Sequence, residues 1–326
     1  MSEKTAEKLA ENFLFSDMDT NDQSLSVFDK QTTNNDGIYR PNLKDAKDQK
    51  LGYKATIRFI KNFITPTQIG PSAIEKHIHY VDMKNNPNVS GYYDCKKNND
   101  PTCELCTEYW KLKNSKNAAD NEKAELLKRT TKYYSYIMVM EDEQHPELVG
   151  KILVYPYGYT IKEKINSERN GEVTAEPCDI FHIEGGKDFR LIIKEKAGFQ
   201  NYDASQFLSE NGKGTPIKIY DEKSEKFKTA PVNENGKITN PKVIQKIMDV
   251  IFYTRTVTLE DHKAKDWSEQ TEGKVNDILS ILAGKEVYVA QQKAQTSKRD
   301  NTSTNEEVSP VENDATDADD FFSLED

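Results

Sequence analysis

Hydrophobic and polar residues alternate with period two in several segments between residues 37 and about 225, and these segments are rich in β-branched and aromatic side chains. Such alternation predicts β-strands with one buried face. The predicted strands cover residues 53–60, 73–81, 133–140, 151–157 and 189–194. Short polar segments at 84–88 and 184–186 are typical of the turns that join strands.

A second set of segments carries apolar residues at helical spacing. These predicted helices cover residues 107–115, 118–127, 160–168, 241–251 and 273–283. Several short strands with scattered helices favour an α+β or mainly β, barrel-like core. The last two helices are expected to flank that core.

The two ends of the chain differ from this core. Residues 1–36 are polar apart from one helical stripe of small and apolar side chains, made by Ala6, Leu9, Ala10, Phe13 and Leu14. This stripe predicts either a detachable helical arm or a frayed terminal helix that packs on its own domain. From residue 291 onward, polar and acidic residues dominate, which predicts a disordered tail. The predicted organisation is an arm (1–36), a core (37–290) and a tail (291–326).

The acidity of the chain is concentrated in the predicted tail. The whole chain has 45 basic and 55 acidic residues, a net charge of −10, but residues 300–326 contain ten acids and no base. The chain before residue 300 is therefore neutral, and its charge does not argue against a nucleic-acid partner. No secretory signal and no run of transmembrane length are recognised, so we expect a cytoplasmic protein without a membrane partner.

Three cysteines and two histidines form the strongest local signal. Cys103 and Cys106 have the CxxC spacing that places two thiolates on one metal ion, and Cys95 lies upstream. A hairpin that turns near residue 87 would place His79 opposite Cys95, while His77 shares a strand face with His79. The pattern predicts one structural Cys3His zinc site with His79 as the fourth ligand and His77 as the alternative.

Other interpretations of these residues have less support. A redox CxxC motif would leave the third cysteine and the histidines unexplained, and unrelated buried thiols are a further alternative. Cys178 stands alone and is expected to pack as a small hydrophobic residue. A zinc deaminase needs H-x-E before P-C-x-x-C, whereas the only H-x-E here, His182–Glu184, follows the CxxC pair. Motifs for nucleotide hydrolysis, zinc proteolysis and serine hydrolysis are absent from the sequence, so we predict no enzymatic activity.

Aromatic residues lie next to basic residues in three places. Residues 128–136 read Lys-Arg-Thr-Thr-Lys-Tyr-Tyr-Ser-Tyr, residues 155, 157 and 159 are tyrosines of one predicted strand face, and Phe199 and Tyr202 follow a lysine-rich strand. Bases of single-stranded nucleic acid stack on such rings while lysine and arginine contact phosphates. Tyrosine also favours ordinary half-buried sheets, so no single ring decides the question. The repeated association predicts a binding face.

With these features, the sequence resembles the single-stranded DNA-binding, or helix-destabilising, proteins of T-even-like bacteriophages. The resemblance covers residues 37–208 and is carried by segments 55–60, 128–134, 150–158 and 198–203 together with the Cys3His residues. It implies an OB-fold barrel with a zinc-bearing subdomain at about 72–130 and a cleft for single strands. It also implies phage DNA replication, recombination and repair as the setting, in the cytoplasm of an infected bacterial host.

The resemblance and the residue pattern together give a set of candidate DNA contacts. The aromatic candidates are Tyr133, Tyr134, Tyr155, Tyr157, Phe199 and Tyr202, and the basic candidates are Arg58, Lys128, Arg129, Lys132 and Lys151. The resemblance further implies cooperative self-association through the N-terminal arm and recruitment of phage replication and recombination proteins by the acidic tail. In the tail, Phe321, Phe322 and Leu324 stand between acids as a candidate partner-docking peptide.

Two departures from the family pattern stand out. The family's arm has a tight basic cluster, whereas residues 2–5 here read Ser-Glu-Lys-Thr. Residues 209–240 resemble an insertion with a predicted strand at 216–220. The alternative function from another class is a zinc-ribbon protein-interaction module that does not bind DNA.

Overall fold

The computed structural model describes residues 37–284 except 66, 67, 174, 175, 210, 211, 222, 223 and 254. The described residues fall into two compact units, one of residues 37–78 and 130–265 and the other of residues 79–129 and 266–284. The predicted arm and acidic tail lie outside the described residues. Within residues 37–284, as far as they are described, no helix is long and apolar enough to span a bilayer.

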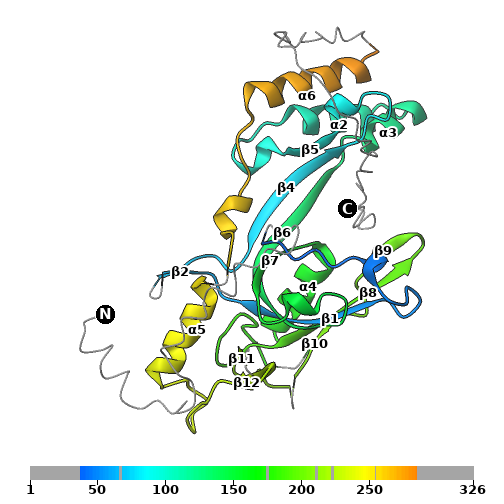
Figure 1. The fold of residues 1–326 in the computed structure, drawn as a ribbon. Coiled ribbons are helices and arrows are strands. Elements are labelled where there is room, and N and C mark those ends of the chain that lie inside the picture. Colours follow the sequence, from blue (N-terminus) through cyan, green and yellow to red (C-terminus); the bar gives the residue numbers. More distant parts are fainter. Residues whose placement is uncertain are drawn as a thin grey trace, which may run out of the picture. The chain divides into compact units, whose positions relative to one another are not determined.

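The first unit is built on an antiparallel sheet (Figure 1). The central strand β1 (Tyr53–Ile60) pairs with β6 (Arg129–Asp142) on one side and with β8 (Asp188–Lys196) on the other. Strand β7 (Ile152–Tyr157) pairs with β6, while β9 (Phe199–Asn201) and β10 (Gln206–Phe207) pair with β8. Two short strands, β2 (Phe63–Thr65) and β3 (Gln68–Ile69), form a separate hairpin.

Side chains on the two faces of this sheet enter two different hydrophobic cores. In β6, for example, Ile137 and Val139 belong to one core, whereas Tyr136, Met138 and Met140 belong to the other. Alternation of this kind follows from the period of two in a β-strand. The sheet of the first unit is therefore covered on both faces.

Two helices of the first unit cover these cores. Helix α4 (Tyr159–Arg169) adds Ile161 and Ile165 to the core that contains Ile137. Helix α5 (Pro241–Tyr253) adds Val243, Ile247 and Ile251 to the opposite core. The paired strands β11 (Lys218–Asp221) and β12 (Lys226–Thr229) lie within the predicted insertion. Ile219 of β11 and the preceding Ile217 belong to the same core as α5.

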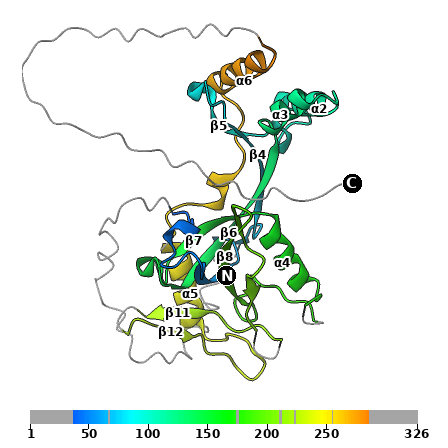
Figure 2. The ribbon, with the colours of Figure 1, turned by 90° about the vertical axis from the view of Figure 1, so that its right-hand side faces the viewer.

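The described part of the second unit is mainly helical, with strand ends beside the helices (Figure 2). The strands β4 (Ile74–Val81) and β6 continue into it from the first unit, and β5 (Gly91–Asp94) is the neighbour of β4 in the sheet. Helices α2 (Glu104–Lys113), α3 (Ala118–Glu125) and α6 (Glu269–Leu282) supply most of the remaining core. Cys95, Cys103 and Cys106 are members of that core, so the predicted metal site lies inside it.

The predicted α+β class is confirmed, and the sheet is mainly antiparallel. The five predicted helices correspond to α2–α6, although α2 begins at Glu104, directly after Cys103, and not at residue 107. The strand order of the described residues runs β10-β8-β1-β6-β4-β5, with β7 on β6 and β9 on β8, and no pairing among them closes the sheet. The OB-fold barrel is therefore not confirmed.

Candidate metal centre and nucleic-acid interface

Four side chains of the second unit converge on one point, and each is placed by a different local structure. His79 lies near the end of β4, and Cys95 directly follows the neighbouring strand β5. Cys103 is the N-cap residue of α2, and Cys106 lies in the first turn of the same helix. The CxxC spacing thus wraps around a helix start, which turns both thiols toward the β4–β5 hairpin. We call these four residues the Cys3His group.

The donor atoms of the Cys3His group have the spacing of a four-coordinate metal site. They all lie within 4.8 Å of one another and all four residues are buried. The His79 Nε2 atom lies 3.6 Å from the Cys103 sulfur and 3.5 Å from the Cys106 sulfur, and the Cys95 and Cys106 sulfurs are 3.5 Å apart. Tetrahedral zinc bonds of about 2.0–2.3 Å place neighbouring donors about 3.5–3.8 Å apart. The group therefore fits a tetrahedral cation.

The surroundings of the group also favour a cation. The Nδ1 atom of His79 lies 2.7 Å from the Leu127 carbonyl oxygen, which leaves Nε2 to face the sulfurs. Burial alone would lower the pKa of His79, but hydrogen bonds with Cys103, Cys95 and Leu127 outweigh burial and raise this pKa to about 9. Hydrogen bonds among the thiols lower the pKa of Cys103 and raise that of Cys106. These thiols cannot all ionise without a compensating positive charge, which a divalent cation supplies.

His77 lies outside the Cys3His group. Its Nδ1 atom is 2.9 Å from the Thr131 hydroxyl, and its Nε2 atom is 3.5 Å from the Glu75 carboxylate. Successive residues of a strand point to opposite faces, so residues two apart, such as His77 and His79, share one face. His77 nevertheless does not belong to the group of residues whose donor atoms lie together. The structure brings together the four ligands that the sequence predicts and leaves the alternative histidine aside.

Substitution of the two histidines separates them as ligands. We expect His79→Ala to lose the bound metal, because removal of Nε2 leaves three donors and a gap in the coordination sphere. We expect His77→Ala to retain one metal ion per chain. Elemental analysis of both purified variants measures this directly, and metal retained by His79→Ala but lost by His77→Ala would reverse the assignment.

Two of the candidate DNA contacts, Tyr133 and Tyr134, lie on opposite faces of β6. Tyr133 stacks on Tyr157 with ring centroids 5.8 Å apart and an interplanar angle of 25°. Tyr134 stacks on His262 at 5.0 Å and 10°. Adjacent strand residues cannot share a face, so the two tyrosines do not line one cleft side by side.

Three candidate contacts are buried in the described structure. Arg58 is 1% exposed, and Tyr155 and Tyr157 are 2% and 4% exposed. The Arg58 guanidinium bonds to Asp188 at 3.2 Å, and the Tyr157 hydroxyl lies 3.0 Å from that of Ser135. All three side chains are thus buried inside the first unit, where Arg58 and Tyr157 already have hydrogen-bond partners and the Tyr155 ring packs against other tyrosine rings. Their direct contact with DNA stays a prediction.

The other candidates are at least partly accessible. Phe199 is 47% exposed and begins β9 after a tight turn in which Ala197 and Gly198 both have positive φ, the backbone of a two-residue hairpin loop. Arg129 is exposed on β6, and the remaining candidates, Lys128, Lys132, Lys151 and Tyr202, are half-buried. The predicted docking residues Phe321, Phe322 and Leu324 lie outside the described residues.

The start of α4 adds residues that the list of candidates lacks. Tyr159 was expected on a strand face with Tyr155 and Tyr157, but β7 ends at Tyr157 and Tyr159 begins α4 after Gly158. Its ring is 47% exposed, and the Lys162 ammonium lies 5.2 Å from the ring centroid. Gly158, the N-cap residue of α4, is the sequence signal that could have identified this helix start, because glycine is accepted at that position.

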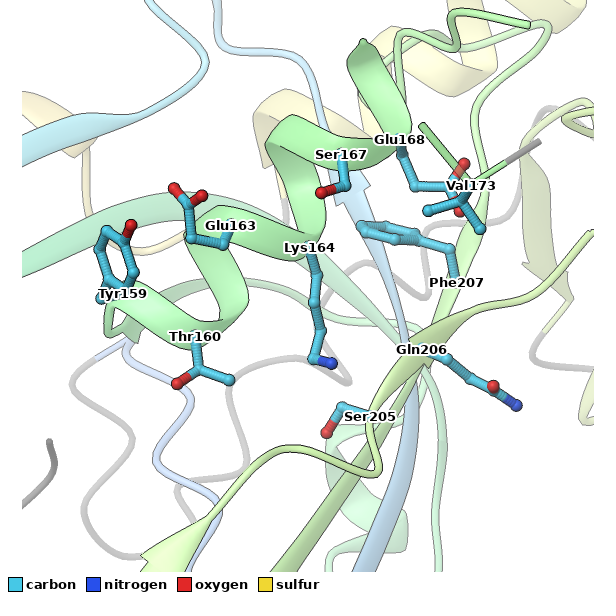
Figure 3. A pocket seen from close by; sticks show the side chains of 10 residues that line it. All are labelled: Tyr159, Thr160, Glu163, Lys164, Ser167, Glu168, Val173, Ser205, Gln206 and Phe207. Carbon is cyan, nitrogen blue, oxygen red and sulfur yellow. The ribbon is translucent and has the colours of Figure 1, made fainter. Parts of the chain in front are cut away.

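A pocket of about 570 Å³ adjoins this helix start (Figure 3). Helix α4 forms one wall with Tyr159, Glu163 and Lys164, and Phe207 of β10 points toward the helix from the other side. The remaining lining residues are Thr160, Ser167, Glu168, Val173, Ser205 and Gln206. The pocket therefore combines two aromatic rings with polar and charged groups, in a volume typical of small-ligand sites.

A comparison with known protein families identifies the chain. The family model described as "gp32 DNA binding protein like" matches residues 54–248, more than half of the 326 residues. The chain belongs to this gp32-like family. Its members are non-enzymatic DNA-binding proteins, which supports the prediction of a chain without enzymatic activity.

Two curated relatives carry similar sequences. The single-stranded DNA-binding protein of Enterobacteria phage T4 is 35% identical over 112 residues, which cover 34% of this chain and 36% of the relative. The single-stranded DNA-binding protein of Enterobacteria phage T2 is 33% identical over 131 residues, which cover 40% of each chain. The chain thus spans well under half the length of these relatives, and the resemblance to the T-even-like phage family is confirmed.

Proposed function

We propose that this gp32-like protein binds single-stranded DNA without strong sequence preference and acts as a non-enzymatic coat protein in phage DNA replication, recombination and repair. The observation that carries the proposal is the family match over residues 54–248, supported by two relatives named as single-stranded DNA-binding proteins. The match includes the Cys3His group and the aromatic and basic residues described above.

The first unit offers suitable chemistry near the start of α4. Half-buried Tyr133 has a raised pKa, chiefly because of burial and also because of the nearby Glu75 carboxylate, and the charges of Lys162 and Glu163 act on it as well. The same Lys162 ammonium lies 5.2 Å from the Tyr159 ring centroid, so one lysine acts on both tyrosines. Rings stack on bases and ammonium groups contact phosphates, so we propose this cluster and the adjoining pocket as part of the DNA-binding surface.

We further propose that the Cys3His group holds one structural zinc ion. A closed set of three thiolates and one imidazole is typical of structural zinc sites, and the ion would supply folding energy to the second unit. The OB-fold architecture that the resemblance implies stays part of this proposal.

The segments outside the described residues are assigned by the resemblance and by composition. We propose that the N-terminal arm mediates self-association on DNA and that the acidic tail, with Phe321, Phe322 and Leu324, recruits phage replication and recombination proteins. A protein with these partners would act in the cytoplasm of the infected bacterial host.

Titration of a fluorescently labelled oligo(dT) with the full chain tests the proposed function. We expect tight binding that weakens steeply as salt rises, because lysine and arginine contacts release counterions from the strand. Duplex DNA of the same length should compete poorly, since its bases are not available for stacking. Absence of any anisotropy change at low salt would overturn the proposal and favour the zinc-ribbon interaction module.

Two single substitutions divide the binding energy into stacking and charge. We expect Phe199→Ala to weaken binding by about 1–3 kcal/mol with an unchanged salt slope. We expect Arg129→Ala to flatten the slope of log affinity against log salt by about 0.7–1. Leu51→Ala, which removes another exposed apolar side chain, serves as the control and should change neither quantity. Equal slopes and equal affinities for all three variants would contradict these two assignments.

A further inference from the structure

Helix α2 of the second unit presents an exposed tryptophan that the proposed DNA contacts do not include. Trp110 is 57% exposed, although tryptophan is highly buried on average. The buried residues of α2 are Leu105, Cys106 and Leu112, and Trp110 is not among them, although it lies one turn after Cys106. The indole of Trp110 therefore does not contribute to the core of this unit.

The indole is held in place by its neighbour. The ring of Tyr109 meets it edge-on, with centroids 5.1 Å apart and an interplanar angle of 79°. Tyr109 itself packs against the hydrophobic core of the second unit. Trp110 is thus an accessible aromatic ring that is supported on one side by Tyr109.

The exposed residues next to Trp110 in the sequence are polar or basic. Residues 107–117 contain three lysines and one glutamate, and Thr107, Lys111, Lys113 and Asn114 are exposed. An aromatic ring with an excess of positive charge is the pattern that suits the bases and phosphates of a single strand.

Two of these lysines already form exposed ion pairs. Lys111 lies 3.0 Å from Glu108, and Lys113 lies 2.9 Å from Glu125. Exposed pairs of this kind are weak, so phosphate groups can replace the carboxylates as partners. Lys116, in the loop after α2, is exposed and has no ion pair among the residues that the structure describes.

From these observations we propose that Trp110, Lys111, Lys113 and Lys116 form a further contact for single-stranded DNA, in which a base stacks on the indole and the lysines hold the flanking phosphates. We call this set the α2 surface. The inference rests on the proposed single-stranded DNA binding and extends it to the second unit. It also gives the Cys3His group a role in binding, because Cys106 and Trp110 are one turn apart on α2 and the metal would fix the helix that carries the indole.

The two tryptophans of the chain make the test specific. Trp267 is half-buried, donates its Nε1–H to the Asp94 carbonyl oxygen at 2.6 Å, and has the Lys96 ammonium 4.4 Å from its ring centroid. In Trp267→Phe only Trp110 remains, and in Trp110→Phe only Trp267 remains. With excitation selective for tryptophan, we expect saturating oligo(dT) to quench Trp267→Phe strongly and Trp110→Phe weakly.

A second measurement uses affinity and separates this inference from the proposed function. We expect Trp110→Ala to bind labelled oligo(dT) about tenfold more weakly than the unchanged chain, with the same metal content and unfolding temperature, since the indole is exposed. Strong quenching of Trp110→Phe, or unchanged affinity of Trp110→Ala, would overturn the α2 surface while the unchanged chain still bound the oligonucleotide. No binding by the unchanged chain would instead overturn the proposed function.

Discussion

Replacement of Cys103 by serine should remove the bound metal and unfold the second unit at a markedly lower temperature than in the unchanged chain. Three of the four residues in the Cys3His group are members of the hydrophobic core of that unit, so the metal site and the core are one structure. Structural zinc contributes about 10–16 kcal/mol of binding free energy, which becomes folding free energy. Loss of one ligand is expected to forfeit several kcal/mol of it.

The fourth cysteine of the chain provides the matched control. Cys178 is half-buried in the first unit, where its thiol lies 3.4 Å from the Gly185 carbonyl oxygen, and it takes no part in the metal group. We expect Cys178→Ser to keep one metal ion per chain and nearly the same unfolding temperature. Elemental analysis and thermal unfolding followed by circular dichroism measure both variants. Full metal content in Cys103→Ser would show that the group does not need this thiol.

Local pattern was sufficient to predict the elements that bring the Cys3His group together. The CxxC spacing predicted two thiols on one metal ion, and the segment between His79 and Cys95 contains the turn that a hairpin needs. Both signals act within a few residues, so no knowledge of the rest of the fold is required. The alternation in β1 likewise predicted a strand, although its burial is not one-sided, since only Lys54 of its eight residues is exposed.

Contacts between distant segments were not predictable in the same way. Arg58 has its partners at His182, Asp188 and Thr215, more than 120 residues further along the chain, and a basic residue in a strand carries no mark of such a partner. The exposure of Trp110 depends on which face of α2 meets the core. Even the correct start of α2, at Glu104 and not at residue 107, does not show which face of the helix packs on the core.

The second large effect concerns this buried arginine. We expect Arg58→Met to lower the free energy of unfolding by about 3–5 kcal/mol, the usual cost of breaking a buried ion pair. The guanidinium donates to the Asp188 carboxylate at 3.2 Å and to the carbonyl oxygens of His182 at 3.2 Å and Thr215 at 2.8 Å. Without it, the buried Asp188 carboxylate and two part-buried carbonyl oxygens lose a donor. Asp188 then keeps only Lys218, at 2.8 Å, of its two ion pairs in the described structure.

A neighbouring arginine shows what an exposed pair contributes. Arg190 lies on the adjacent strand β8 and donates to Glu141 at 2.8 Å, but both side chains are accessible. Exposed pairs contribute about 0–1 kcal/mol, so Arg190→Met should cost far less than Arg58→Met in chemical denaturation. Equal losses for the two variants would show that Arg58 is not held in a buried network.

The same pair of variants tests whether Arg58 contacts DNA. A side chain that neutralises a phosphate contributes about 0.7–1 to the slope of log affinity against log salt, and its removal flattens that slope. Arg58 is 1% exposed, so we expect Arg58→Met, measured well below its unfolding temperature, to bind oligo(dT) with the slope of the unchanged chain. Arg129→Ala, which removes an exposed arginine, is the positive control. A flattened slope for Arg58→Met would mean that the network opens on binding and that the arginine then reaches the strand, as the sequence resemblance implied.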